Sequence, residues 1–262
     1  MQNPIKFILL VALVFTCSPN IFAQTIDPKA EAILKTAVEK LGGERYLQAR
    51  TIVSSGNYTL FRDGIADLPA GFVDVISFPD KERTEFKQAG SKTVQTNFGE
   101  NGWIYDGGSR NLREQNEKEI EGFKRGLRTS LDGLLRGAWR TKGAALAYVG
   151  RREASVGKRN DVVKLTYTDG FTVEFEFAAD GLPMKAVFKS SNPETPDAKE
   201  EERYAQFVEV QGVYAPFIVD RFVGGKPQSR INYLKIEFNK SVPDSIFTKP
   251  ANVKDLKKDL KL

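Results

Sequence analysis

The stretch NLREQNEKEIEGFKRGLRTSLDGLLRGAW (Asn111–Trp139) is a long helical pattern set between segments that alternate as β-strands do. Winding it at about 100° per residue gathers its charged side chains on one face and its large apolar side chains on the next. Asn111 and Glu114 have the spacing of a capping box, so we expect the helix to begin there. The apolar face consists of Ile120, Phe123, Leu127, Leu131, Leu134 and Leu135.

Four glycines, Gly122, Gly126, Gly133 and Gly137, share a third, narrow ridge of this predicted helix. Each interior glycine lowers the stability of a helix by roughly 1 kcal/mol relative to alanine. We therefore expect something to press closely against the ridge, or the helix to move. The sequence leaves open whether the neighbour of the ridge is protein or a bound lipid.

A second amphipathic helix is predicted after the N-terminal segment. Asp27 and Pro28 suit the N-cap and the first helical position, and Gly42-Gly43 ends the pattern. This helix has one apolar face to bury, which consists of Ala30, Ile33, Leu34, Ala37, Val38 and Leu41.

Most of the remaining chain has the two-residue period of β-strands, interrupted by short turns such as Asp63-Gly64 and Asn101-Gly102. Such turns leave no room for crossover helices, so we expect an antiparallel sheet. The predicted strands cover 52–61, 72–78, 82–88, 92–98, 103–105, 146–152, 161–168, 171–177, 182–189, 204–210, 214–223 and 229–238.

These elements predict an α+β fold in a single domain, residues 24–262. A sheet of about eleven antiparallel strands has to curl or close. We expect one strongly curved sheet with the N-terminal helix and the mid-chain helix on its concave face. The polar segment 190–199, with two prolines, is expected to be a loop.

Residues 1–23 are predicted to be a cleavable secretory signal peptide. Lys6 is basic, the run Phe7–Phe15 is apolar, and the small residue Ala23 precedes the expected cleavage site. The apolar run is too short to span a bilayer, and the mature protein is expected to be soluble. Cleavage would remove Cys17, the one cysteine; a lipidated N-terminus at Cys17 is the alternative.

Charge and composition exclude several classes of function. Removing residues 1–23 takes away one basic residue and no acid, so the net charge falls from +5 to +4. Basic and acidic residues are interspersed, which favours solubility, allows a weak attraction to anionic membranes and argues against nucleic-acid binding. The sequence has no histidine, which excludes catalytic triads, histidine bases and nearly all zinc or copper sites.

Carboxylates remain, and a glycosidase needs only two of them. The clustered acids lie beside lysine or arginine, and we expect them to form solvated surface: Glu114, Glu117, Glu119, Glu174, Glu176, Glu200, Glu201 and Glu202. We therefore expect no enzymatic activity, no catalytic residue, no metal site and no cofactor. Two acids converging within about 5–10 Å in an open cleft would restore a hydrolase hypothesis.

The apolar and aromatic side chains exceed what one helix can cover, which favours a cavity for an apolar ligand. The alternative is that the same residues simply make up the core. The predicted contacts on the helix side are Phe123, Leu127, Leu131 and Trp139. The predicted contacts on the sheet side are Trp103, Tyr105, Phe171, Phe175 and Phe177.

Three segments follow one another in the C-terminal half: DGLPMKAVFK (Asp180–Lys189), ERYAQFVEVQGVYAPFIVDRF (Glu202–Phe222) and INYLKIEFNKSVPDSIFTKP (Ile231–Pro250). The last contains the pattern P-D-x-x-F-x-x-P. Together with ENGWIYDGG (Glu100–Gly108), which is similar to a G-x-W-x-Y strand, they resemble the outer-membrane lipoprotein-sorting, LolA/LolB-like family.

The resemblance implies an incomplete β-barrel of about eleven strands wrapped over helices, with a hydrophobic cavity between sheet and helices. It also implies a periplasmic location and the binding of acyl chains. Carriers of this family hold their closed form with an arginine near the lid. Arg125, Arg128, Arg136 and Arg140 all lie in or near the mid-chain helix, and the sequence does not choose among them.

The predicted function is that of a monomeric, non-enzymatic carrier that holds the acyl chain of a lipid or lipidated protein. An envelope membrane or a membrane-bound protein would be a further partner. Release would require the mid-chain helix to shift. The alternative is a periplasmic interaction or sensor protein whose cavity is filled by its own helices and which binds a protein partner.

Overall fold

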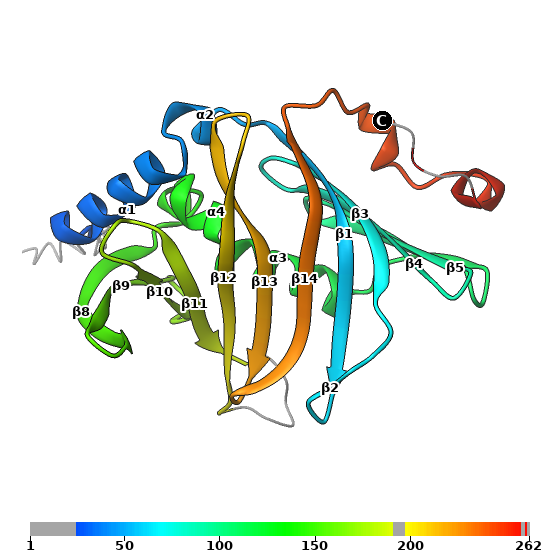
Figure 1. The fold of residues 1–262 in the computed structure, drawn as a ribbon. Coiled ribbons are helices and arrows are strands. Elements are labelled where there is room, and N and C mark those ends of the chain that lie inside the picture. The colour runs from blue at the N-terminus through cyan, green and yellow to red at the C-terminus, as the bar shows by residue number, and fades with distance from the viewer. Residues whose placement is uncertain (1–24, 191–196, 258–259, 261–262) are drawn as a thin grey trace, which may run out of the picture.

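The structure is a computed structural model that describes residues 25–190, 197–257 and 260 (Figure 1). The predicted signal peptide and Cys17 lie outside the described residues. None of the helices in the described part of the chain is both long and apolar enough to span a bilayer.

One large antiparallel sheet dominates the fold, with the strand order β7-β6-β5-β4-β3-β1-β14-β13-β12-β11-β10-β9-β8 (Figure 1). The strands from the first edge to the middle are β7 (Asn111–Glu114), β6 (Asn101–Asp106), β5 (Ser91–Phe98), β4 (Lys81–Gln88), β3 (Ala70–Ser77) and β1 (Thr51–Arg62). Those from the middle to the other edge are β14 (Lys226–Phe238), β13 (Val213–Val223), β12 (Lys199–Val210), β11 (Pro183–Lys189), β10 (Thr172–Phe177), β9 (Lys158–Thr166) and β8 (Ala145–Ser155). Only the short β2 (Ile65–Ala66), paired with β1, lies off this path.

The predicted α+β architecture is confirmed, although the described residues form 14 strands in the sheet where we expected about eleven. The sequence pattern missed β2 and β7, and β12 begins within the segment 190–199 that was expected to be a loop. β7 was missed because the predicted helix was extended over its residues.

The helices lie in two segments of the chain, one before β1 and one between β7 and β8. They are α1 (Pro28–Leu41), α2 (Glu44–Leu47), α3 (Glu117–Thr129) and α4 (Leu131–Leu135). Short 3-10 turns follow at Arg140–Lys142, Asp244–Ile246 and Val253–Lys257. Because β7 and β8 are opposite edge strands, the segment between them, which contains α3 and α4, has to cross one face of the sheet. We call this the inner face.

The predicted N-terminal helix is confirmed as α1. The Asp27 carboxylate accepts a hydrogen bond from the backbone N–H of Lys29 (2.8 Å), and Gly42 ends the helix with φ of 124°. Its buried residues pack into the main core with Leu134 and Trp139, so α1 and α4 cover the same face of the sheet.

The predicted mid-chain helix is wrong in two details. It begins at Glu117, where Asn116 and Glu119 form the capping box that we expected at Asn111 and Glu114. It also breaks at Ser130, whose backbone is extended (φ −70°, ψ 146°).

The break at Ser130 is held by local hydrogen bonds. The Ser130 hydroxyl donates to the carbonyl of Leu127 (3.1 Å) and accepts from the N–H of Gly133 (2.9 Å). A Cβ at Gly133 would lie 2.3 Å from the Leu127 carbonyl oxygen, so the turn requires glycine. A serine cap therefore ends α3 and starts α4 inside one continuous apolar pattern.

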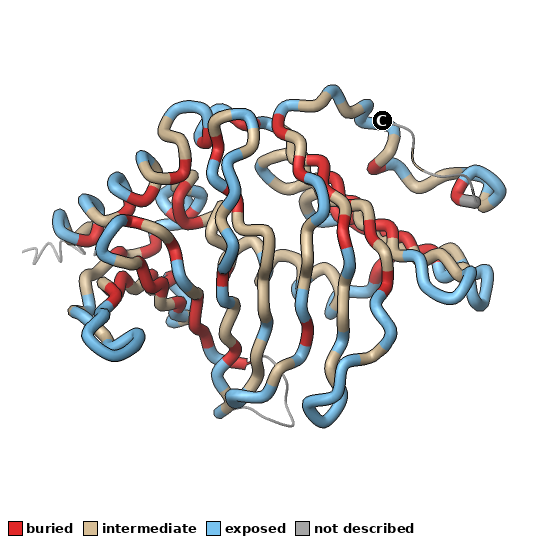
Figure 2. The backbone as a smooth tube through the Cα atoms, viewed as in Figure 1, coloured by how far each residue is buried: buried red, intermediate tan, exposed pale blue. Residues whose placement is uncertain are grey.

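The opposite, outer face of β1, β3, β5 and β6 is covered by the C-terminal segment, which runs past β3–β5 in Figure 1. Phe247 packs on Val53 and Val75, and the Trp103 indole N–H donates to the Phe247 carbonyl (2.9 Å). Figure 2 shows buried residues both here and where α1 meets β8–β11. The sheet is thus covered on two faces, and only the inner one carries α1, α3 and α4.

Candidate functional site

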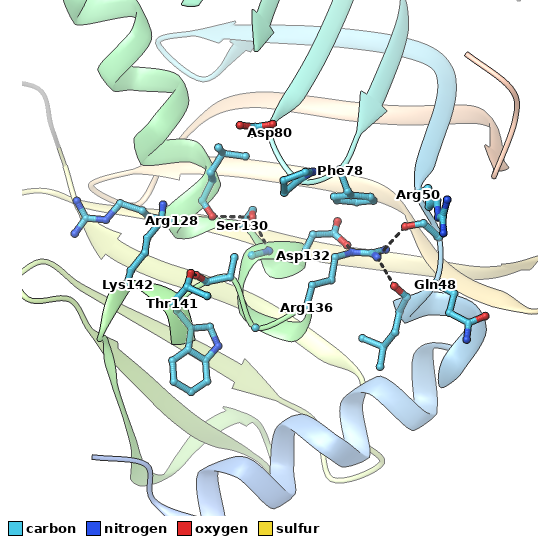
Figure 3. A pocket seen from close by; sticks show the side chains of 18 of the residues that line it. Gln48, Arg50, Phe78, Asp80, Arg128, Ser130, Asp132, Arg136, Thr141 and Lys142 are labelled. Carbon is cyan, nitrogen blue, oxygen red and sulfur yellow. Dashed lines mark hydrogen bonds and ion pairs between the residues drawn. The ribbon is translucent and has the colours of Figure 1, made fainter. Parts of the chain in front are cut away.

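Three neighbouring clefts lie between the helices and the inner face. The wide cleft, about 980 Å³, lies between α4, the turn that follows it, and the segments 47–50 and 78–80 (Figure 3). The α3 cleft, about 500 Å³, lies between α3 and strands β3–β6. The α4 cleft, about 320 Å³, lies between the start of α4 and the central strands of the sheet.

The clefts adjoin one another at the break between α3 and α4. Ser130 and Asp132 line all three of them. Leu127 and Phe78 line both the wide cleft and the α3 cleft, and Ile76 lines both the α3 cleft and the α4 cleft. The helix break therefore stands where the three spaces meet.

Two glycines of α3 help to keep the α3 cleft open. Gly122 and Gly126 line it, and no other atom comes within 4 Å of the position that a Cβ would take at either residue. Of the two neighbours left open for the glycine ridge, protein is therefore absent at these two positions among the described residues. Gly137 differs again, because its φ of 76° is left-handed.

Arg136 ties α4 to the chain after α2. Its guanidinium donates to the carbonyls of Leu47 and Ala49 (3.0 Å each) and to the Asp132 carboxylate (2.9 Å; Figure 3). It also lies over the ring of Phe78, 3.8 Å from the centroid. Of the four candidate arginines, Arg136 is thus the one that fixes α4 across the wide cleft.

The other three arginines hold the flanks of the helical segment. Arg128 pairs with Asp169 (2.7 Å). Arg140 pairs with Glu31 of α1 (2.6 Å), and Arg125 donates to the backbone carbonyl of Lys189. None of these three contacts reaches the segment 47–50.

The inner face of β3–β5 is polar where it lines the α3 and α4 clefts. Burial raises the pKa of Asp74 to about 6, although a hydrogen bond from the Thr84 hydroxyl (2.7 Å) opposes the shift. Burial, together with the charge of Asp74, raises the pKa of Glu82 from 4.5 to about 8. Glu82 and Asp74 both line the α4 cleft, and Glu82 also lines the α3 cleft.

No sequence pattern marks Asp74 or Glu82, and the clustered acids were expected to form solvated surface. That expectation is wrong for Glu176, which is 1% exposed and paired with Arg152 (2.9 Å) and Lys185 (3.3 Å). It is also wrong for Glu200, which is 4% exposed and paired with Arg221, and for Glu202, which lines the α4 cleft and whose pKa is raised by burial. Alternation placed these residues on polar faces, but only the fold shows which polar faces are covered.

Four of the nine predicted cavity residues line the clefts. Phe123 lines the α3 cleft, Leu127 lines both that cleft and the wide cleft, Trp139 lines the wide cleft, and Leu131 lines the α4 cleft. All four are the predicted contacts on the helix side.

The five predicted contacts on the sheet side lie elsewhere. Trp103 and Tyr105 point to the outer face, where they cluster with Val94 and Leu256 of the C-terminal segment. Phe175 and Phe177 are buried in the main core, and Phe171 packs at its margin. On β6, the intervening Ile104 lines the α3 cleft in place of Trp103 and Tyr105.

Among the residues that the structure describes, no group of three or more acids, histidines or cysteines is placed to hold a metal ion. The clefts are lined by aliphatic and aromatic side chains, three arginines, two lysines and a set of carboxyl, amide and hydroxyl groups.

No protein-family model matches the sequence, and no curated protein is similar to it in sequence. Solved structures do share its fold. A DUF1329 family protein from Desulfovibrio piger ATCC 29098 superimposes with a TM-score of 0.59 at 13% identity, over 84% of this chain and 97% of that one. A putative outer membrane lipoprotein-sorting protein domain from Vibrio parahaemolyticus gives 0.57 at 14% identity, over 87% and 100%.

A LolA superfamily protein from Nitrosomonas europaea gives a TM-score of 0.55 at 17% identity, over 84% of this chain and 97% of that one. At these identities the likeness is one of fold. It confirms that the predicted resemblance to lipoprotein-sorting proteins holds for the architecture of nearly the whole described chain.

Proposed function

We propose that this chain, which shares its fold with lipoprotein-sorting and LolA superfamily proteins, is a non-enzymatic carrier of acyl chains. The observation that supports this most directly is the set of clefts that adjoin at Ser130 beneath α3 and α4. The acyl chain of a lipid or lipidated protein would be bound by burial, at about 0.8 kcal/mol per methylene group.

Arg136 supplies a physical means of retaining and releasing such a chain. Its hydrogen bonds to Leu47 and Ala49 hold α4 against the chain after α2, and its pairing with Asp132 fixes the guanidinium. Movement of α4 would have to exchange these bonds for water, at a modest net cost for each bond. The wide cleft would then open along the side where Arg136 now bridges it.

The proposed setting is the periplasm, reached through the predicted signal peptide of residues 1–23. The proteins that share the fold include one described as an outer membrane lipoprotein-sorting domain, which supports a lipidated partner. We propose a monomer that receives its ligand from a membrane or a membrane-bound protein.

Binding of a fluorescent fatty-acyl probe tests this function. Leu127→Glu places a charge where the wide and α3 clefts meet, and we expect it to weaken binding of the probe at least about tenfold. Leu234→Glu is the matched control, since Leu234 is 71% exposed and should tolerate the change. Equal binding by both variants, or no binding by the wild-type protein, would contradict the proposal.

The alternative of an interaction protein with a self-filled cavity fits one part of the molecule. The inner face over β8–β11 is filled by α1 and α4, whereas the spaces beside α3 are not filled. A wild-type protein that binds no acyl probe but retains a protein partner would favour this alternative.

The hydrolase alternative has one observation in its favour. Asp74 is paired in register with Thr84, two residues from Glu82, and the pKa values of the two carboxyl groups are both raised. A hydrolase would turn over chromogenic glycosides or esters and lose this activity in Glu82→Gln. We expect no turnover by either protein.

A further inference from the structure

The floor of the α3 cleft presents hydrogen-bond acceptors side by side. Glu82 of β4 and Asn97 of β5 are directly opposite each other in the antiparallel register, and both line the cleft. Asn97 is only 3% exposed, and its side-chain oxygen accepts no hydrogen bond from any described residue. A buried acceptor without a donor is costly, so the oxygen calls for a donor that enters the cleft.

The Glu82 carboxyl is in a similar position. The charge of Asp74 raises the pKa of Glu82 further instead of lowering it. The other walls of the α3 cleft include the apolar side chains of Ile104 and Phe123, and those of Gln95 and Ser130, which can both donate and accept hydrogen bonds. When Asp74 and Glu82 are both ionised, their charges favour a cation placed beside them.

The cleft also has room for a small polar group and a route for the chain attached to it. Gly122 and Gly126 leave the space over the floor open. Glu82 lines the α3 cleft and the α4 cleft together with Ile76, so a ligand bound at Glu82 can extend into the largely apolar α4 cleft.

We propose that Glu82 and Asn97 bind the primary ammonium headgroup of an amphiphile whose alkyl or acyl chain lies in the α4 cleft and the wide cleft. This inference rests on the proposed function and specifies its ligand class. An ammonium group has three N–H donors and no acceptor, which matches a floor made of acceptors. Its positive charge offsets the cost of keeping the Glu82 carboxylate out of water. A phosphate or carboxylate headgroup would meet acceptors and negative charge here.

Competition among ligands of equal chain length tests the headgroup. Dodecylamine, dodecanol and dodecanoate would each displace the fluorescent fatty-acyl probe from the full chain at pH 9, where Glu82 is ionised and the amine is still protonated. We expect the wild-type protein to bind the amine about tenfold more tightly than the alcohol, as for one charge-assisted hydrogen bond. In Glu82→Gln this preference should fall to about twofold or less, while the affinity for the alcohol stays unchanged.

Two further variants separate the headgroup contact from a general disturbance. Asn97→Leu removes the acceptor and keeps the carboxyl, and should lose about half of the preference on a logarithmic scale. Glu209→Gln, at an exposed position of β12, should keep the whole preference.

The outcomes that overturn the inference are distinct from those that overturn the carrier function. Equal affinity for amine and alcohol in a wild-type protein that binds both, or a preference for dodecanoate, would overturn the headgroup assignment and leave the carrier function standing. If the wild-type protein binds no probe, both the headgroup assignment and the carrier function are overturned.

Discussion

The two halves of the inner face contrast in how they are covered. In the filled half, β8–β11, large apolar side chains such as Phe175 and Phe177 are 1% exposed and pack with the buried face of α1. In the open half, β3–β6, the floor carries Asp74, Glu82 and Asn97, and the covering helix α3 leaves a cleft of about 500 Å³.

The open half contains residues that lower the stability of the fold, whereas the filled half is closely packed. Gly122 and Gly126 each lower helix stability by roughly 1 kcal/mol, although no neighbouring atom requires glycine at either position. Buried carboxyl groups with raised pKa values also oppose folding at neutral pH. Both features are explained if the open half holds a ligand and the filled half supplies the stability.

The largest expected effect compares core truncation in the two halves. Phe175→Ala should lower the free energy of unfolding by about 3–5 kcal/mol, because it leaves a cavity in a close-packed core. Leu127→Ala should lower it by only about 1 kcal/mol, because Leu127 already borders open clefts. Urea unfolding of the two variants measures both values. Similar losses of unfolding free energy in both would contradict the difference between the two halves.

A smaller effect, with a sign that depends on pH, is expected at Glu82. Its pKa is about 8 in the folded protein against an ordinary 4.5, so the folded state holds a proton that the unfolded chain releases. The stability of the wild-type protein should therefore fall as the pH rises from about 4 to about 8. Glu82→Gln removes this dependence and should be more stable by about 1–3 kcal/mol at pH 8, with no gain near pH 4.

Thermal or urea unfolding of Glu82→Gln at several pH values checks this prediction. Glu209→Gln, exposed on β12, serves as the control and should follow the wild-type protein at every pH. A gain in Glu82→Gln that is the same at pH 4 and pH 8 would show that the carboxyl is not responsible.

The sequence predicted those parts of the fold that local signals determine. Asp27 and Gly42 bound α1 as expected, and the short turns fixed an antiparallel sheet. The break at Ser130 could not be predicted in the same way, because the apolar residues continue at helical spacing on both sides of it. Serine followed three residues later by Gly133 was the available signal.

The candidate site was predictable only on the helix side. Period-two alternation shows that Trp103 and Tyr105 share a face and that Ile104 points the other way, but it does not say which face is concave. We expected Trp103 and Tyr105 on the concave face, whereas they lie on the outer one. The C-terminal segment that covers Trp103 there has little periodicity of its own, so the sequence did not reveal that cover. The polar floor at Glu82 likewise becomes visible only once α3 is placed over it.

The chain's two tryptophans lie on opposite faces of the sheet, so they provide the most direct test of whether a ligand binds in the clefts. Trp139 lines the wide cleft on the inner face, whereas Trp103 is buried on the outer face beneath Phe247. A long-chain alcohol brominated along its chain quenches tryptophan fluorescence only at short range. We expect strong quenching in Trp103→Phe, which retains Trp139, and little in Trp139→Phe. Equal quenching in both variants, or none in either, would contradict binding in the clefts beneath α3 and α4.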